Sequence, residues 1–333
     1  MGDDGAPQRL RVLFWNTFLL KVDLGEALPM PLPSRLGRLS VFSAPSVAPR
    51  MREVATLLRD SDYDVMALTE VFDESDRQVL AEAWAAADRP EVVAGPMSDD
   101  RSRRWAVGGK SSGLCTISHR RVVRSVTHRY RAAGSRVHDS DAFAAKGVLL
   151  VEVELPTPGI NLEIYSTHLL FGGDLVPRRG AAKVAAPYDV RFAQVDELLA
   201  FVAEQHRPGN VAVVCGDFNI GASDRRLADD PERMGRRLAE RLDGAGFDDV
   251  WALYGLGEAK TCDMRVPDRE GARIDYFYLG RPGSMGTEGV ATVRVVTMRQ
   301  GEIPRAPDSP DFDKMPVLSD HAALELELEI TLI

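Results

Sequence analysis

Residues 210–219 read NVAVVCGDFN, an apolar run that ends in two polar residues separated by one aromatic residue. The first six residues have the length and composition of a buried β-strand. Because side chains two positions apart in an extended chain point to the same side, Asp217 and Asn219 can face one site while Phe218 points into the core. An Asx turn after a buried strand explains the same residues equally well. The stretch therefore predicts a core strand and leaves two interpretations of its polar end.

The same arrangement, an apolar strand that ends at a polar residue, recurs along the chain. We expect strands at 10–14, 64–68, 113–117, 121–130, 147–155, 161–167, 273–279 and 322–330, and helices at 50–60, 75–87, 190–206 and 231–245. Loops rich in Gly and Pro are expected elsewhere, including the stretch after residue 279. Neither a repeat nor a change in composition marks a linker. We therefore predict one domain over residues 1–333, of mixed α/β class with two packed sheets.

The composition restricts the partners, the redox state of the cysteines and the location that we expect for the protein. The net charge of −9 argues against a large phosphate-tracking surface, so a nucleic-acid partner is less expected, although a bound cation would add local positive charge. Cys115, Cys215 and Cys262 form neither a disulfide framework nor a zinc pattern, and we expect reduced thiols. The chain begins without a basic leader and has no apolar run of ~20 residues. It is expected in the cytoplasm, or outside the cell if a signal peptide has been removed.

Eight polar residues of catalytic type lie at the ends or mouths of predicted strands. One such residue carries little information, but eight predict a shared rim where side chains converge on a ligand. They are Asn16, Glu70, His168, Asp217, Asn219, Asp275, Asp320 and His321.

Glu70 follows the strand DVMALT, in which Asp64 is the only other ionisable residue. A carboxylate at such a position is paired, protonated or bound to a cation. Oxygen ligands from Glu70, Asn16 and Asp320 suit Mg²⁺, with Mn²⁺ or Ca²⁺ as alternatives, better than they suit zinc. The other interpretation is a carboxylate that caps the following helix.

The histidines suggest acid–base chemistry. Asp275, within RIDYFYL, could accept the ring N–H of His321 and orient it, or it could form a salt bridge with Arg273 or Arg265. Together with His168, this gives two histidines for a general base and a general acid. A single histidine in such a place is more often structural, so the prediction depends on the surrounding carboxylates.

In chain order, the motifs LFWNTF, ALTEVFD, YSTHL, GDFN, RIDY and LSDH resemble those of the endonuclease/exonuclease/phosphatase superfamily. The segments EVFDESDRQ, FAAKGVLLVEVEL and VRFAQVDELLAFV are more similar to bacterial and neutral sphingomyelinases than to nucleases. The resemblance implies a four-layer α/β sandwich in which two mixed sheets are flanked by helices. It also implies a divalent metal, usually Mg²⁺, and in-line attack of an activated water on phosphorus.

The resemblance also implies roles for individual residues. Glu70 would hold the metal, with Asn16 and either Asp217 or Asp320 nearby. Asp217 and Asn219 would position the nucleophile and the phosphoryl oxygens.

The histidine roles implied by the resemblance complete this assignment. His321, oriented by Asp275 or Asp320, would be the general base. His168 would stabilise the transition state or protonate the leaving oxygen.

The sequence thus predicts a metal-dependent hydrolase of phosphate esters, of sphingomyelinase or phospholipase C type, with a lipid-like or small-molecule substrate. The alternatives are a cytosolic small-molecule phosphomonoesterase, then an endonuclease, then a non-catalytic binding module on the same fold. Some secreted sphingomyelinases carry an exposed aromatic hairpin that docks on membranes, whereas Phe312 is the single aromatic residue of segment 296–317 here. Peripheral membrane contact is therefore left open. Residues 24–49 could cover a substrate or form a surface loop, and the basic cluster at 101–105 is expected to be a solvated loop.

Overall fold

The computed structural model describes residues 7–19, 44, 46–84, 90–97, 111–142, 144–155, 159–172, 178, 180, 182–224, 226–227, 229–254, 260–262 and 272–333. The basic cluster at 101–105, and residues 24–43 and 45 of the proline-rich stretch, lie outside these residues. Arg265, one of the salt-bridge partners considered for Asp275, lies outside them as well.

The described residues form two six-stranded sheets. Sheet A has the order β11-β12-β1-β2-β4-β3, with β1 (Gln8–Asn16), β2 (Val65–Thr69), β3 (Glu91–Ala94), β4 (Cys115–Ser118), β11 (Ala291–Gln300) and β12 (Leu324–Leu332). Sheet B has the order β5-β6-β7-β8-β10-β9, with β5 (Val122–Arg129), β6 (Gly147–Glu154), β7 (Asn161–His168), β8 (Val211–Asp217), β9 (Phe247–Asp249) and β10 (Asp275–Gly280). Both sheets are mixed, because β1–β2 and β7–β8 are parallel pairs and the other pairs are antiparallel.

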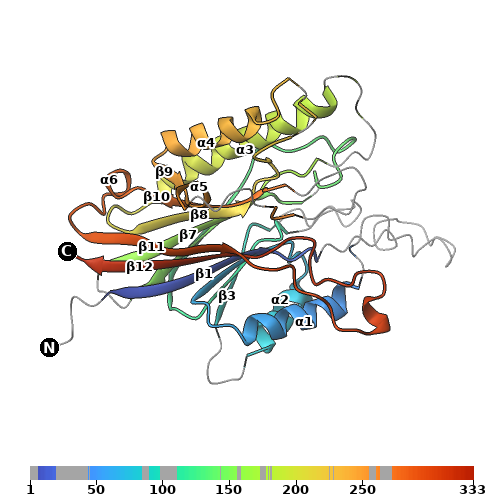
Figure 1. The fold of residues 1–333 in the computed structure, drawn as a ribbon, viewed down its shortest axis with the longest axis horizontal. Helices are drawn as coiled ribbons and strands as arrows, with labels where there is room; N and C mark the ends of the chain where they lie inside the picture. The colour runs from blue at the N-terminus through green and yellow to red at the C-terminus, as the bar shows by residue number, and fades with distance from the viewer. Residues whose placement is uncertain are drawn as a thin grey trace.

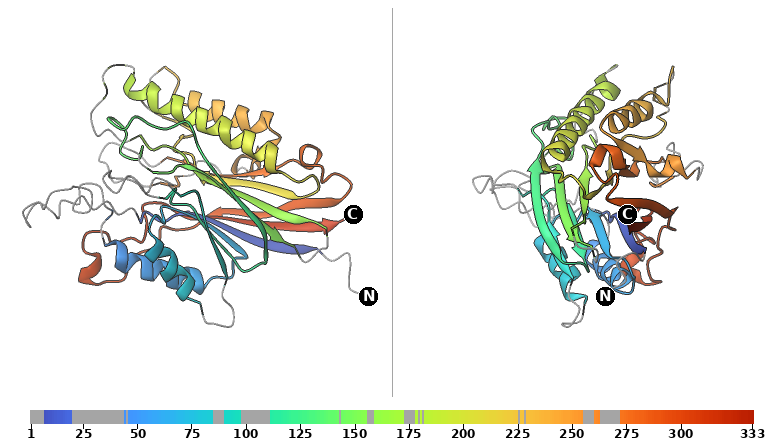
Figure 2. Two further views of the ribbon diagram at one scale, coloured as in Figure 1. Left: turned by 180° about the vertical axis from the view of Figure 1, so that it is seen from behind. Right: turned by 90° about the vertical axis from the view of Figure 1, so that its left-hand side faces the viewer.

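Helices cover the outer face of each sheet (Figures 1 and 2). Helices α1 (Val47–Arg59) and α2 (Glu74–Glu82) pack on sheet A, and α3 (Ala182–Gln205) and α4 (Arg233–Gly244) pack on sheet B. The short α5 (Val250–Leu253), α6 (Pro282–Met285) and η2 (Pro310–Phe312) lie in connections. This arrangement confirms the predicted four-layer α/β sandwich.

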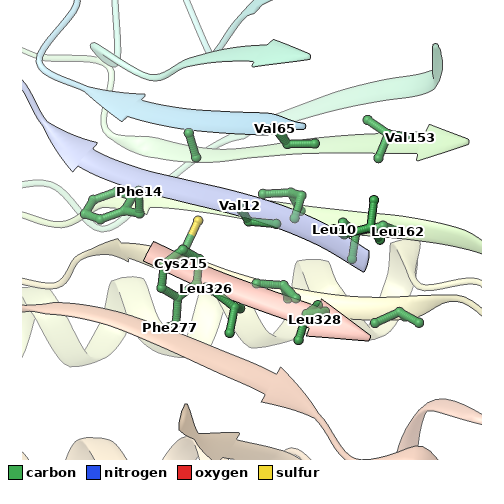
Figure 3. Packing of buried hydrophobic residues seen from close by; sticks show 14 of the residues in the cluster. Leu10, Val12, Phe14, Val65, Val153, Leu162, Cys215, Phe277, Leu326 and Leu328 are labelled. Atoms are coloured by element: carbon green, nitrogen blue, oxygen red, sulfur yellow. The ribbon is translucent and has the colours of Figure 1, made fainter. Parts of the chain in front are cut away.

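The main core lies between the two sheets (Figure 3). On β12, with the sequence LELELEITL, the leucines point inward and the glutamates outward, as the period of two requires. Leu326 and Leu328 meet Val12 of β1 and face Phe277 and Leu162 of sheet B. Each such buried side chain contributes about 1.5–3 kcal/mol relative to an exposed one, so the alternation fixes which face of each strand turns inward.

The sequence prediction differs from the structure in several places. Strands β3 and β9 lie where no strand was expected. The stretch after residue 279 was expected to be a loop, but residues 291–300 form the edge strand β11, whose buried and exposed positions alternate only in part. The helix expected at 190–206 begins eight residues earlier, at Ala182, and includes Pro187. Its first two turns have no apolar periodicity, so the pattern did not show them.

Among the described residues, no helix is long and apolar enough to cross a membrane.

The strand directions bring the polar strand ends together. The parallel strands β1 and β2 of sheet A end at the same edge, and so do β7 and β8 of sheet B. Strand β10 begins with Asp275 directly opposite Asp217, and His168 also pairs with Asp217 in register. One end of the sandwich therefore collects side chains from both sheets.

Candidate active site

Asn16 joins the two sheets at the centre of the site. Its Nδ2 donates hydrogen bonds to Oδ2 of Asp217 at 2.9 Å and to Oε1 of Glu70 at 3.4 Å, and lies 3.5 Å from Nε2 of His321. Its Oδ1 accepts the backbone N–H of Phe18 at 3.1 Å. The role of Asn16 as a metal ligand stays a prediction; in this arrangement its amide oxygen accepts one N–H, and its nitrogen faces the carboxylates of Asp217 and Glu70.

Glu70 combines a strained backbone with a buried carboxylate. Its φ of 65° lies in the left-handed region, which costs a non-glycine residue about 1–3 kcal/mol and is typical of functional sites. Its Oε2 is buried and accepts no hydrogen bond from the described residues. Burial, followed by the charge of Asp320, raises the pKa of Glu70 to about 7. The position therefore disfavours a bare carboxylate and would favour one that is bound to a cation.

Asp217 and Asn219 fit both interpretations of the GDFN motif. The N–H of Asn219, whose φ is 51°, donates to Oδ1 of Asp217 at 2.8 Å, which is an Asx-type turn. The other oxygen of Asp217 faces Asn16, and burial, followed by the charge of Asp275, raises the pKa of Asp217 to about 6. Nδ2 of Asn219 donates to the carbonyl of Leu169 at 3.1 Å, so it anchors the loop after His168.

His321 and Asp275 form a buried pair. Nδ1 of His321 lies 2.8 Å from Oδ2 of Asp275, and both side chains are nearly inaccessible to solvent. Burial alone would lower the pKa of His321, but the charge and the hydrogen bond of Asp275 raise it well above its usual range. Arg273, the alternative partner for Asp275, instead binds Asp249 at 2.9 Å. Among the residues that the structure describes, the geometry therefore favours the orienting interaction over a salt bridge with Arg273.

His168 is buried in a different electrostatic environment. Its Nε2 lies 3.6 Å from Oδ2 of Asp217, and its Nδ1 has no hydrogen-bond partner among the described residues. Burial and the nearby charge of Lys146 hold the pKa of His168 well below its usual range. A neutral imidazole can donate one hydrogen bond, so this residue is better suited to stabilise an oxygen than to deliver a proton from an imidazolium.

Lys146 belongs to the site although it was not singled out from the sequence. It is 5% exposed, its Nζ lies 3.1 Å from Oδ2 of Asp141, and its charge acts on both Glu70 and His168. The available signal was a lysine placed directly before the buried strand β6, within the segment FAAKG. A buried ammonium at a carboxylate-rich site is a candidate for binding a phosphoryl oxygen.

Arg50 was also missed, because the pattern of residues 50–60 only indicated a helix. Its fully buried guanidinium donates from Nη1 to the carbonyls of Leu318 (2.7 Å) and Thr17 (3.3 Å), and from Nη2 to that of Phe18 (2.5 Å). Arg50 therefore fixes the chain after Asn16 to the chain before Asp320. Burial lowers the pKa of Arg50 to about 10.

We expect Arg50→Lys to lower kcat about tenfold with a smaller change in KM, because a point donor cannot replace a planar one that binds carbonyls on two segments. The lost charged hydrogen bonds also predict a stability loss of about 1–3 kcal/mol. Steady-state kinetics and thermal unfolding measure both effects. Arg52→Lys, at an exposed position two residues along α1, is the control. Equal values of kcat in wild type and Arg50→Lys would contradict this positioning role.

The donor set fits a divalent cation. The charges of Asp320 and Asp217 both act on the buried carboxylate of Glu70. The Asp275–His321 pair lies next to them, with ligand atoms within 4.8 Å of one of Asp217. The buried oxygens Glu70 Oε2, Asp275 Oδ1 and Asp320 Oδ1 accept no hydrogen bond from the described residues. Buried carboxylate oxygens without donors are expected where a cation binds. All eight predicted residues thus lie at this end of the sandwich.

This geometry agrees with the family to which the chain belongs. Residues 15–321 match the model of the endonuclease/exonuclease/phosphatase family, so the chain is a member of it. Among curated proteins, it is 27% identical over 241 residues to sphingomyelin phosphodiesterase 2 of Rattus norvegicus, covering 69% of this chain and 50% of the relative. It is 28% identical over 187 residues to the Homo sapiens protein of the same name, covering 53% and 38%. The chain thus spans half or less of the length of these relatives.

Solved structures show the same fold at lower identity. Sphingomyelinase C from Streptomyces griseocarneus has a TM-score of 0.59 at 19% identity, covering 96% of this chain and 99% of that one. A beta toxin mutant from Staphylococcus aureus with bound magnesium ions has a TM-score of 0.58 at 16% identity, covering 96% and 99%. D. rerio TDP2 complexed with a single-strand DNA product also has a TM-score of 0.58, at 14% identity, covering 96% and 99%. The predicted superfamily and the resemblance to sphingomyelinases are confirmed, whereas the fold alone does not select a substrate.

Proposed function

We propose that this chain is a metal-dependent hydrolase of phosphate diesters, of sphingomyelinase or phospholipase C type. The observation that carries the proposal is the convergence of Glu70, Asp217, His168 and the Asp275–His321 pair at one end of the sandwich. The similarity in sequence to sphingomyelin phosphodiesterases supports a lipid-like diester as the substrate.

The residues that would hold a cation are Glu70 and Asp320, with Asp217 beside them. Their donors are carboxylate oxygens, which Mg²⁺ prefers and which Mn²⁺ and Ca²⁺ also accept. When bound, the ion would supply positive charge to offset the negative charge that builds on the phosphoryl oxygens.

The remaining residues act on the water and on the phosphate. Asp275 holds Nδ1 of His321, so Nε2 is directed toward Asn16 and Asp217 and can take a proton from a water molecule. Lys146 and the neutral His168 provide donors for phosphoryl or leaving-group oxygens. Asn16 and Asn219 keep Asp217 and the loop at Leu169 in place.

The surface of the described residues bears on the choice of substrate. Phe312, the aromatic residue of segment 296–317, packs in the core formed by sheet A and α1 and is 6% exposed. It is therefore not available as a surface anchor for a bilayer in this conformation. The net charge of −9 disfavours extended contact with nucleic acid. A diester with a small head group is therefore favoured over DNA as the substrate. Separately, the localisation of the protein in the cytoplasm stays a prediction.

A substrate panel tests the proposal. Sphingomyelin, a choline phospholipid, an aryl phosphodiester, an aryl phosphomonoester and plasmid DNA are each incubated with the chain and Mg²⁺. We expect cleavage of choline lipids and of the aryl diester, at rates at least about tenfold above the monoester. Cleavage of the monoester alone would assign the chain to small-molecule phosphatases, and cleavage of DNA alone would assign it to nucleases. Turnover of none of the five would contradict the proposal.

A further inference from the structure

Cys262 lies beside the proposed general base and has no part in the proposed hydrolysis. The residue is 2% exposed, and isolated β-bridges join its backbone to Ala272 on one side and to His321 on the other. The carbonyl of Thr261 accepts the N–H of Ala322 at 2.8 Å, which holds this segment against the residues before β12. The thiol interacts with the imidazole of His321, and burial raises the pKa of Cys262 to about 11.

The thiol completes a mixed donor set. Ligand atoms of Cys262, Asp320 and His321 all lie within 4.8 Å of one another, and Nε2 of His321 is 4.0 Å from Oδ1 of Asp320. This Oδ1 is buried and accepts no hydrogen bond from the described residues. A carboxylate, an imidazole and a thiol are therefore close enough together for one ion to contact all three.

The chemistry of this set differs from that of the oxygen-rich set around Glu70. Sulfur and imidazole nitrogen favour Zn²⁺ and other thiophilic divalent ions, whereas carboxylate oxygens alone favour Mg²⁺. A site with three protein ligands leaves a fourth tetrahedral position for water or another oxygen. No sequence pattern indicated this site, because Cys262 is far in the chain from Asp320 and His321 and belongs to no zinc-type spacing.

We propose that Cys262, Asp320 and His321 form a second cation site, selective for Zn²⁺ or a similar thiophilic ion, whose occupancy stops hydrolysis. On binding, the thiol proton is released to solvent and the sulfur coordinates the ion without any redox change. His321 coordinated through its nitrogen cannot accept a proton from water. The inhibitory effect rests on the proposed function, whereas the binding of the ion does not.

Binding is tested first without turnover. The metal-free full chain is titrated with Co²⁺, which reports thiolate coordination through a sulfur-to-metal charge-transfer band, and Zn²⁺ is then used to displace it. We expect one equivalent to give the band in wild type and in Cys115→Ala, whose thiol is fully buried in another part of the core. The band should be lost in Cys262→Ser and in Cys262→Ala. Absence of the band in wild type, or its persistence in both Cys262 variants, would overturn the proposal.

Inhibition is tested second, with buffered Zn²⁺ at a fixed Mg²⁺ concentration. The zinc concentration for half inhibition is expected to rise at least about tenfold in Cys262→Ser relative to wild type and Cys115→Ala, because loss of a ligand weakens metal binding by at least this factor. Each variant is compared with its own zinc-free rate. Equal half-inhibitory concentrations would place the inhibition at the oxygen-rich site and refute the inhibitory role of Cys262. If no substrate is turned over, the cobalt titration still decides whether the site exists.

Discussion

Replacing Glu70 by glutamine is expected to lower kcat/KM by about 10³-fold and to weaken Mg²⁺ binding strongly, while the fold remains intact. The carboxylate is buried, one of its oxygens accepts no hydrogen bond from the described residues, and its backbone is held at a φ of 65°. The bound ion would stabilise the charge of the transition state by several kcal/mol. Removing one of its ligands is therefore expected to slow the reaction by this factor. Kinetics over a range of Mg²⁺ concentrations and calorimetric titration of the ion measure the two effects.

Although Glu70→Gln is expected to lower activity, it is expected to raise the stability of the metal-free protein at high pH. The folded-state pKa of Glu70, about 7, lies above the unfolded value of 4.5, so folding binds this proton more tightly. The resulting stability is complete below pH 4.5 and is lost as the pH rises through 7. Without metal, Glu70→Gln should therefore melt at a higher temperature than wild type at pH 8 and show little difference at pH 5. Glu240→Gln, an exposed glutamate on α4, is the control. Unchanged Mg²⁺ affinity in Glu70→Gln would rule out Glu70 as the metal ligand.

The positions of the site residues followed from the sequence because of a general property of strands. Apolar runs that end at Asn16, Glu70, His168 and Asp217 indicate buried strands, and parallel neighbours end at the same edge of a sheet. Periodicity alone does not say which strands are neighbours or that two sheets align their polar ends. That part of the prediction came from the order of motifs and their resemblance to a family.

What the sequence did not predict depends on contacts between distant segments. The role of Arg50 requires that the ends of two distant segments, at Thr17 and Leu318, lie within reach of one guanidinium. Lys146 looked like an ordinary residue before a strand, and Cys262 like an isolated thiol. The orientation of the Asn16 amide is likewise set by the N–H of Phe18 and by the carboxylates of Asp217 and Glu70. No pattern of residue types encodes such contacts.

The second large effect is expected at the Asp275–His321 pair. Asp275→Asn keeps the size of the side chain but removes the charge that raises the pKa of His321. Because a general base works only when deprotonated, the acid limb of the pH–rate profile should move to lower pH in this variant. The rate at the plateau should fall by about 10²–10⁴-fold, since the ring loses its orientation and basicity. His321→Ala should lose activity to a similar extent and show no such limb.

The shift of the acid limb in Asp275→Asn distinguishes two roles of Asp275. A residue that tunes and orients His321 moves the limb, whereas a residue that only supports the packing does not. NMR titration of the His321 ring in the metal-free protein should show its pKa falling in Asp275→Asn, independently of turnover. Asp248→Asn on the neighbouring strand β9, whose carboxylate pairs with Arg281, is the control and should leave both the ring pKa and the pH profile unchanged. If His321→Ala retained activity within tenfold of wild type, another group would have to be the base. A loss of rate in Asp275→Asn with the limb and the ring pKa unmoved would mean that Asp275 supports the packing of β10 against β8 and does not tune the histidine.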